Sequence, residues 1–455
     1  MDLKPTTRRN FLGLALGVPA AAALAACGGT APTQTGAGGG AGAPSASGGG
    51  GGGAATYWYL SGPPGEQIRD DTVKRFNAAN PDTQIKGTKF QNDAYKTKIK
   101  TALGAGQGPT IIWGWGGGGL REYVKNDQVV DLTSFFSENA GVKSRLFPAS
   151  FGAATVDGKV YALPTETVQP IVLYWNKKVF DKVGAQPPQS WADIMSLVEK
   201  FNSAGVAPFS LGGQSRWTNM MWLEFLLDRQ AGPEVFQNVF EGKPDAWSDP
   251  AVTDMLTKVQ DLVKANGFVK GFASITADSN ADQALLYTGK AAMMLHGSWT
   301  YGSMKASGGD FVTGGHLGFM NFPALEGGKG DPSNTVGNPA QYYAISSKAD
   351  AGAQETAKKF FSTTVSDDTE AGQWIDAGNV PIVKGTDAKL AASKDAEFLK
   401  FIYDTSANAK TFAQSWDQAL PTSAAETLLD NIAKLFALSI TPQQWIDNMN
   451  KAIVK

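Results

Sequence analysis

The segment Val160–Trp175, with the sequence VYALPTETVQPIVLYW, contains two short apolar runs close together. Val160–Pro164 and Ile171–Trp175 both carry branched and aromatic side chains, which is typical of strands. The residues between the two runs, 165–170, are mostly polar. The segment therefore predicts two strands joined by a short polar connection.

The same kind of apolar run recurs along the chain and alternates with amphipathic stretches, which predicts α/β architecture. Further strands are expected at 56–60, 83–90, 110–113, 291–295 and 341–345, and helices at 66–79, 93–103, 190–201 and 249–266. The last third is expected to be mostly helical. A chain of 455 residues with 42% hydrophobic content can bury a large core, and two domains are expected instead of one.

The first 26 residues have the pattern of an export signal. Arg8 and Arg9 precede an apolar run, 11–26, that is short for a membrane span and ends in small residues. This pattern indicates a twin-arginine signal peptide. LAAC at 24–27 resembles a bacterial lipobox, so Cys27, the only cysteine, is expected to be acylated and to become the mature N-terminus. A free buried cysteine after an ordinary signal peptide is the alternative.

Residues 27–55 contain almost nothing that can be buried, because glycine, alanine and small polar residues dominate them. Such a composition predicts a flexible tether. The expected picture is a globular body held by a lipid anchor at the outer face of a cell membrane.

Composition and absent motifs exclude several classes of function. There are 40 Lys and Arg against 42 Asp and Glu, with no block of like charge, so nucleic acid is not an expected partner. His296 and His316 are the only histidines, which excludes a His/Cys metal site but not a carboxylate site. Neither G-x-S-x-G nor H-E-x-x-H occurs. We expect no cofactor, but a secreted carbohydrate-active enzyme with two carboxylates stays open as an alternative.

Gly114, Gly116 and Gly119 have the spacing G-x-G-x-x-G, which raises the alternative of a tethered dinucleotide-dependent oxidoreductase. That fingerprint belongs to the first strand-to-helix turn of a chain, whereas these glycines follow the third expected strand. Glu138 has about the right spacing for the acidic partner, but its surroundings are not strand-like. The spacing is therefore interpreted as a coincidence within a run of glycines.

Five segments in this order resemble the extracellular solute-binding proteins of sugar ABC importers, the family that contains the maltose- and oligosaccharide-binding proteins. They are FNAANPDTQIKGTKF, WGGGGL, YALPTETVQPIVLYWNKKVFDKVGAQPPQSWADI, GKAAMMLHGSWTYGSMK and the late helix that begins near Trp416. The resemblance implies a two-lobed fold of the periplasmic-binding-protein type (type II), with the ligand in a cleft between α/β lobes. It implies lobe I at 56–166 with 342–390, lobe II at 170–335 with 395–455, and crossing segments near 167–170, 336–341 and 390.

The resemblance also implies what the protein does. It implies reversible capture of a neutral sugar of two to four units and delivery to a membrane permease that a separate ATPase powers, without chemistry on the sugar. The protein is expected to be a monomer and to come from a Gram-positive, actinobacterial cell.

A sugar presents hydroxyl groups and C–H faces, so its site combines aromatic rings with polar side chains and backbone amides. The aromatic candidates are Trp115, Trp217, Trp299, which matches the family's platform position, and Trp416. Trp191, Trp222, Trp247 and Trp445 are expected in the core. The polar candidates are Ser61, Asn92, Asp93, Glu166, Gln169, Gln214, Arg216, Asn338 and Asp417.

Four further expectations concern single residues. Asp93 has a plain helix N-cap as its alternative. Gly116 and Gly117 are expected to remove bulk so that a sugar can approach backbone amides at a helix start. His296 is expected to be packed or hydrogen-bonded and not a ligand.

Overall fold

The computed structural model describes residues 53–453. The expected signal peptide, the expected lipidation site Cys27 and the expected tether up to residue 52 lie outside the described residues. Among the described residues, no helix combines the length and apolar character needed to cross a membrane.

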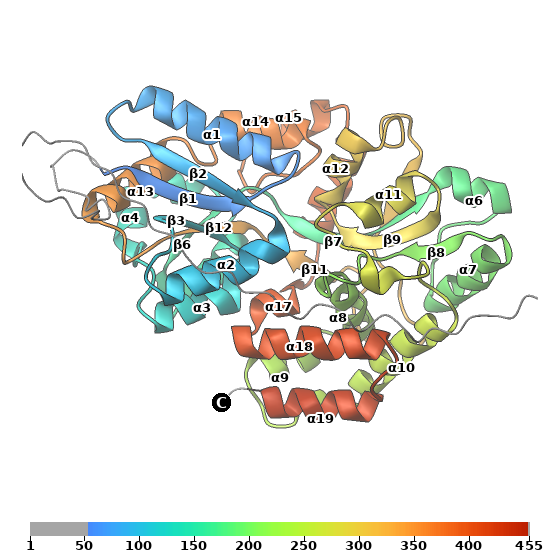
Figure 1. The fold of residues 1–455 in the computed structure, drawn as a ribbon. Helices are drawn as coiled ribbons and strands as arrows, with labels where there is room; N and C mark the ends of the chain where they lie inside the picture. Colours follow the sequence, from blue (N-terminus) through green and yellow to red (C-terminus); the bar gives the residue numbers. More distant parts are fainter. Residues whose placement is uncertain (1–52, 454–455) are drawn as a thin grey trace, which may run out of the picture. The chain divides into compact units, whose positions relative to one another are not determined.

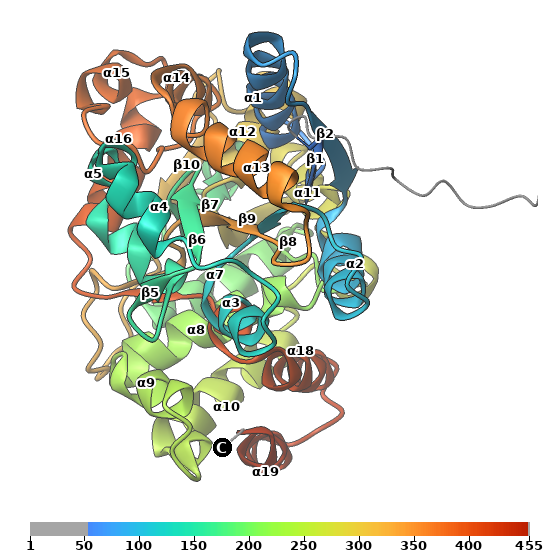
Figure 2. The same cartoon turned by 90° about the vertical axis from the view of Figure 1, so that its left-hand side faces the viewer.

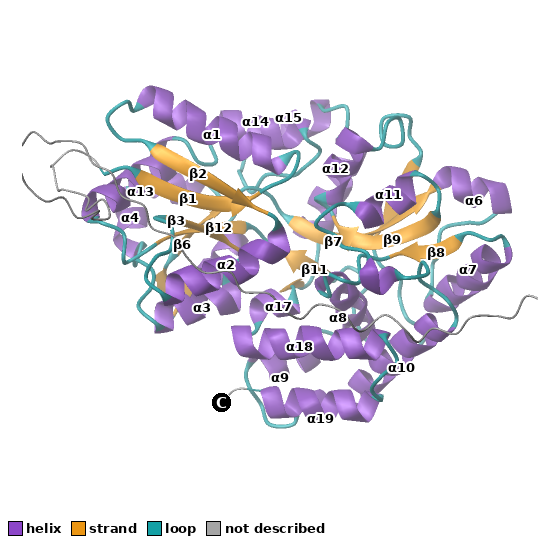
Figure 3. Cartoon of the chain, in the orientation of Figure 1, coloured by secondary structure: helices purple, strands orange, loops and turns teal. Residues whose placement is uncertain are grey.

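Two separate sheets organise the chain (Figure 1; Figure 3). The first sheet has the order β2 (Ile85–Phe90), β1 (Ala55–Leu60), β3 (Ile111–Gly114), β12 (Gln341–Ile345) and β6 (Ala162–Thr165). The second has the order β13 (Phe412–Gln414), β11 (Thr335–Asn338), β7 (Gln169–Asn176), β9 (Ala291–Gly297) and β8 (Ala207–Ser210), with β10 (Leu317–Met320) also paired to β7. We call the part packed on the first sheet lobe I and the part packed on the second lobe II; their predicted residue boundaries stay predictions.

Helices surround both sheets. In chain order they are α1 (Gly65–Ala79), α2 (Asn92–Gly104), α3 (Gly117–Lys125), α4 (Thr133–Glu138), α5 (Ala140–Arg145), α6 (Lys177–Val183), α7 (Trp191–Ser203), α8 (Trp217–Ala231), α9 (Glu234–Phe240), α10 (Pro250–Lys264), α11 (Ala281–Tyr287), α12 (Thr300–Ser307), α13 (Ala351–Thr363), α14 (Asp368–Asp376), α15 (Asp387–Ala392), α16 (Ala396–Ala407), α17 (Trp416–Ala419), α18 (Thr422–Phe436) and α19 (Pro442–Ala452). Short elements complete the set: η1 (Pro148–Ala154), β4 (Thr155–Val156), β5 (Lys159–Val160), η2 (Ala246–Ser248) and η3 (Phe272–Ser274). In lobe I, α1 and α13 lie over one face of the sheet and α2 and α3 over the other (Figure 1; Figure 2).

The strands and helices expected from the apolar pattern are confirmed, with small changes at their ends. The run 160–164 is divided: Lys159–Val160 pairs with β4 in a hairpin, and Ala162–Thr165 joins the first sheet. β1 begins at Ala55, one residue earlier than expected, because the Ala55 N–H donates to the Gln84 carbonyl and the residue is buried. Ser190 caps α7 by accepting from the Asp193 N–H.

The sequence did not indicate α8 or strands β8, β10, β11 and β13. α8 is buried on almost every side, so it lacks the polar face that makes an amphipathic helix recognisable. Its first residue is Trp217, one of the aromatic candidates for the site. The strands are short, and periodicity is a weak signal over three or four residues.

The chain passes from β6 to β7 through residues 166–168 and returns from β11 to β12 through Pro339 and Ala340. Glu166, in the first passage, has a left-handed backbone with a φ of 61°. β7 then serves two cores: Val172 and Tyr174 belong to the cluster shared with lobe I, and Ile171 and Leu173 to the cluster of lobe II. This alternation follows from the two-residue period of a strand.

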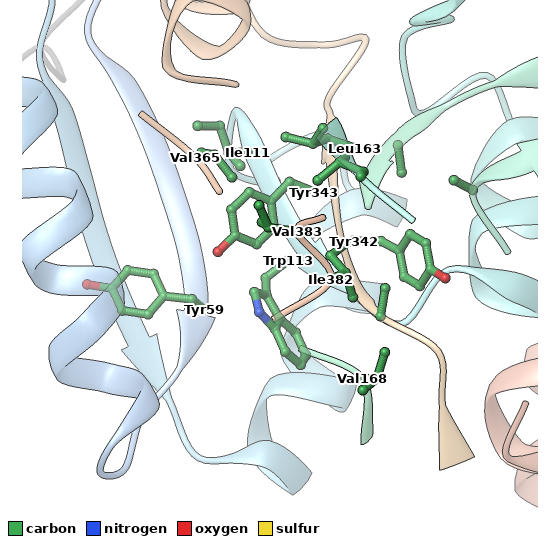
Figure 4. Packing of buried hydrophobic residues seen from close by; sticks show 14 of the residues in the cluster. Tyr59, Ile111, Trp113, Leu163, Val168, Tyr342, Tyr343, Val365, Ile382 and Val383 are labelled. Atoms are coloured by element: carbon green, nitrogen blue, oxygen red, sulfur yellow. The ribbon is translucent and has the colours of Figure 1, made fainter. Parts of the chain in front are cut away.

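β12 lies inside the first sheet with all five residues buried. Figure 4 shows Tyr342 and Tyr343 pointing to opposite sides. The Tyr342 hydroxyl donates to the Ser150 carbonyl at 2.9 Å, and the Tyr343 hydroxyl donates to Glu166 Oε1 at 2.8 Å. Both buried hydroxyls therefore have partners, as burial in an apolar core requires.

The glycines after β3 allow other backbone segments to approach closely. A Cβ on Gly118 would lie 2.0 Å from the Leu420 carbonyl oxygen, and one on Gly116 would lie 2.5 Å from the Ala153 carbonyl oxygen. A Cβ on Gly119 would meet nothing within 4 Å. Gly118 thus allows α3 of lobe I to pack against the residue that follows α17.

Replacing Gly118 with Ala should destabilise the protein by about 1–3 kcal/mol, because a backbone carbonyl cannot rotate away from the new methyl group. The control is Gly119→Ala, which adds the same methyl group to the same helix in open space and should be neutral or stabilising by up to about 1 kcal/mol. Urea unfolding of both variants measures the difference. Equal midpoints for the two variants would contradict the close approach.

Glu370 on α14 is a buried carboxyl near the first crossing. Its Oε2 accepts from the Ser366 N–H at 2.6 Å, and its Oε1 accepts from Trp374 Nε1 at 3.3 Å. Burial raises the pKa of Glu370 from 4.5 to about 7. The folded protein therefore keeps this group protonated at pH values where the unfolded chain has already ionised it.

A raised carboxyl pKa contributes stability that is complete below pH 4.5 and is lost as the pH rises toward 7. Relative to Glu370→Gln, the wild-type free energy of unfolding should fall across this window by up to roughly 3 kcal/mol. Urea unfolding at several pH values measures this. Glu355→Gln, at an exposed position of α13, is the control. Parallel pH curves for wild type and Glu370→Gln would show that Glu370 titrates normally.

Candidate ligand-binding site

A cavity of about 240 Å³ lies where loops of both lobes meet, and we call it the cleft cavity. Lobe I contributes the loop after β1, the start of α2 and the loop after β3; lobe II contributes the start of α8 and the loop after β9. Gln169 and Asn338, at the two passages between the sheets, also line it. Loops of both lobes and residues at two of the passages between the lobes therefore meet at one place.

A second cavity, of about 670 Å³, lies on the other face of the crossing strands. Val168 lines this second cavity while Gln169 lines the cleft cavity, and Trp416 lines the second while Ser415 and Asp417 line the cleft. Val168 and Gln169 are adjacent in an extended segment, so their side chains point in opposite directions, which explains the division at this passage. The larger cavity is mainly apolar, so the cleft cavity is the better candidate for a ligand rich in hydroxyl groups.

Trp217 and Trp299 form an aromatic group on the lobe II side of the cleft cavity. Their ring centroids are 6.1 Å apart, and each lies 5.4 Å from the ring of His296. Gly297 makes this arrangement possible, because a Cβ there would lie 1.8 Å from the Trp299 ring. His296 is buried, and its Nε2 lies 3.3 Å from Asp282 Oδ2. The histidine thus supports the two indoles.

Trp115 lies on the lobe I side. Its ring centroid is 4.7 Å from that of Trp113 in an edge-on arrangement. Lys96 Nζ lies 5.0 Å from the Trp115 ring and 2.9 Å from Asp417 Oδ2. A paired cation and an indole therefore share this wall.

A buried ion pair between Arg69 and Glu166 lies beneath the cavity. Arg69 Nε and Nη2 donate to the two carboxylate oxygens at 2.7 and 2.6 Å, and Trp113 Nε1 donates to Oε1 at 2.9 Å. The guanidinium also lies 5.4 Å from the Trp113 ring and 5.7 Å from the Trp374 ring. The pair satisfies its own charges, as buried ions must, while Arg69, Trp113 and Trp374 line the cavity.

Two buried acceptor atoms at the cavity lining receive no hydrogen bond from the described residues: Asp278 Oδ1 and Asn338 Oδ1. Burial raises the pKa of the Asp278 carboxyl. A buried acceptor without a donor is costly, so a ligand that supplies hydroxyl donors would fit here. The described residues contain no cluster of three or more His, Cys, Asp or Glu side chains suited to a metal ion.

The structure brings eight of the predicted site residues to the cleft cavity. They are Ser61, Asn92, Trp115, Gln169, Trp217, Trp299, Asn338 and Asp417. Their contact with a ligand stays a prediction.

The other predicted residues lie outside the lining of the cleft cavity. Trp416 is in the core of lobe II, stacked on Phe236 with centroids 4.8 Å apart. Glu166 is buried in its ion pair, Gln214 is exposed, and Arg216 pairs with Glu426 and Asp430. Gly116 and Gly117 pack closely against other parts of the chain. A Cβ on Gly116 would lie 2.5 Å from the Ala153 carbonyl oxygen, and one on Gly117 would lie 2.3 Å from Gln414 Oε1. Asp93 makes hydrogen bonds to lobe II.

Four lining residues were not predicted from the sequence: Arg69, Trp113, Asp278 and Trp374. Arg69 and Trp374 are on helices, where a large side chain is normally interpreted as a solvent-exposed residue or a core residue. Trp113 ends a strand, which was a usable signal, because loop-facing strand ends commonly carry ligand groups. Nothing in the sequence around Asp278 distinguishes it from other loop aspartates.

Comparison with known proteins identifies the family of the chain. The family model described as bacterial extracellular solute-binding protein matches residues 61–371. The maltotriose-binding protein of Pyrococcus abyssi is 24% identical over 56% of this chain and 51% of its own length. The chain spans between 51% and 63% of the length of eight curated relatives that it matches.

Solved structures resemble the chain over most of its length. One, from a study of xylan utilization by the thermophilic bacterium Caldanaerobius polysaccharolyticus, is 32% identical with a TM-score of 0.79 and covers 88% of this chain and 99% of its own. A chitin oligosaccharide binding protein shares the fold at 24% identity, with a TM-score of 0.76, over 88% of this chain and 98% of its own. The chain belongs to the bacterial extracellular solute-binding protein family and has its two-lobed α/β fold.

Proposed function

We propose that this chain reversibly binds a neutral oligosaccharide of two to four units in the cleft cavity. The observation that carries the proposal is the meeting of Trp217 and Trp299 with the unpartnered acceptors of Asp278 and Asn338. Indole rings suit the C–H faces of a sugar, and the acceptors suit its hydroxyl groups. The names of the maltotriose- and chitin-oligosaccharide-binding relatives support the same class of ligand.

The charges at the cavity favour a neutral ligand. Arg69 and Lys96 are the cationic side chains in its lining, and Glu166 and Asp417 already pair with them. An anionic sugar would therefore have to compete with existing ion pairs. We infer that the protein performs no reaction and delivers its sugar to the permease of an ABC importer.

Isothermal titration calorimetry with xylo-, malto- and chito-oligosaccharides and raffinose tests the binding proposal. One of these oligosaccharides should bind with a micromolar dissociation constant, which corresponds to a binding free energy of about −8 kcal/mol. Amino acids and metal ions serve as unrelated solutes. Binding of such a solute with no response to any oligosaccharide would contradict the proposed ligand class, and release of reducing sugar would contradict the absence of chemistry.

Trp299→Ala should weaken binding of that oligosaccharide about tenfold or more, because it removes one of the two adjacent indole faces. Trp191→Ala, at the start of α7 and outside the cavity, is the matched control and should leave the dissociation constant unchanged. Titration calorimetry measures both. Wild-type affinity in Trp299→Ala would remove this ring from the site.

We also propose that Cys27 anchors the mature chain through lipid at the outer face of the cell membrane. The twin-arginine pattern and LAAC at 24–27 support this proposal. Cys27→Ala should shift the protein from the membrane fraction to the culture medium or periplasm of the expressing cell. A membrane-bound Cys27→Ala protein would contradict the anchor.

A further inference from the structure

Asp93, at the start of α2 in lobe I, makes two side-chain hydrogen bonds across the cleft. Its Oδ1 accepts from Trp217 Nε1 at 3.2 Å, and its Oδ2 accepts from the Ser215 hydroxyl at 2.8 Å. Both donors belong to lobe II. The carboxylate therefore joins the two lobes at the edge of the cleft cavity.

A third hydrogen bond runs between the same segments. The backbone N–H of Asp93 donates to Asp278 Oδ2 at 3.0 Å. This N–H is one of the free donors in the first turn of α2, where the helix dipole favours a negative charge. Asp278 of lobe II thus satisfies the helix end of lobe I.

These contacts differ from an ordinary N-cap. Gln91 is the N-cap residue of α2, and its side chain makes no capping hydrogen bond. Asp93 lies within the helix, and its carboxylate accepts from lobe II and from the neighbouring Asn92 side chain. The carboxylate therefore stabilises the contact between the two lobes more than it stabilises helix α2.

The contacts also reach the ligand site. Trp217 lines the cleft cavity. The indole N–H is the only hydrogen-bond donor of its side chain. When Asp93 accepts from that donor, the indole plane is fixed beside Trp299. Ser215 is buried and does not line the cleft cavity. A substitution of Ser215 therefore tests the contact between the lobes without changing the lining of the cavity.

We propose that Asp93 is a positioning residue that acts as a latch: it holds the lobes together, both without a ligand and over a bound one, and orients Trp217 through the same hydrogen bonds. This inference rests on the proposed function for its ligand. The two lobes enclose the ligand when they close. The latch should therefore affect release of the ligand more than its capture. Breaking it should raise the dissociation rate constant and change the association rate constant little.

A double-mutant cycle separates the latch from a direct ligand contact. Asp93→Ala should raise the dissociation rate constant of the oligosaccharide about tenfold, Ser215→Ala should raise it less, and the double variant should resemble Asp93→Ala. Asp82→Ala, in the exposed turn before β2, is the control and should match the wild type. Stopped-flow tryptophan fluorescence measures the rates. Fully additive effects, or a rate unchanged in Asp93→Ala, would overturn the latch.

Small-angle X-ray scattering gives a readout that needs no sugar. Asp93→Ala should have a larger radius of gyration than the wild type in the absence of any solute. The substitution removes the side-chain hydrogen bonds that hold the two lobes together. Trp217→Phe, which keeps a ring but removes the donor, should shift the radius in the same direction. Failure of every oligosaccharide to bind would contradict the proposed function alone, whereas unchanged radii in both variants would overturn the latch.

Discussion

The buried ion pair between Arg69 and Glu166 is the interaction on which the junction of the lobes depends. Glu166 follows β6 directly and has a left-handed backbone, which costs about 1–2 kcal/mol for a residue with a side chain. Its carboxylate accepts four hydrogen bonds, from Arg69, Trp113 and Tyr343. Arg69 also donates to the Leu60 carbonyl at the end of β1. Elements from three places in lobe I thus fix the direction in which the chain leaves for lobe II.

The same pair determines the shape of the cleft cavity. It holds the guanidinium against Trp113 and Trp374, and Trp113 in turn packs edge-on against Trp115. Removal of either charge would leave the other buried without a partner, which is far more costly than loss of the pair as a whole. Glu166 therefore affects the cavity from beneath, through the aromatic wall that it holds in place.

The fold was largely predictable because its strands are apolar runs with clear periodicity, and the order of family segments fixed the architecture. α8 was not predictable in this way, since a helix buried on every side has no polar stripe. At the site, Trp299 and Gln169 could be placed because they lie next to recognisable strands. The pairing of Glu166 with Arg69, and of Asp93 with Trp217, joins residues about a hundred positions apart. No local pattern encodes such partners.

The two cavities on opposite faces of the crossing strands constrain how the lobes can move. Any rotation about these strands that widens the cleft cavity narrows the larger cavity on the other face. That larger cavity is mostly apolar and also contains Glu224, whose pKa is raised by burial. Exposure of apolar surface there costs free energy in proportion to its area, so a rotation that narrows the larger cavity and covers this surface would relieve part of that cost. In the proposed function, ligand contacts and the hydrogen bonds of Asp93 would oppose that tendency. Substitutions on either face of the crossing should then change the affinity for the ligand.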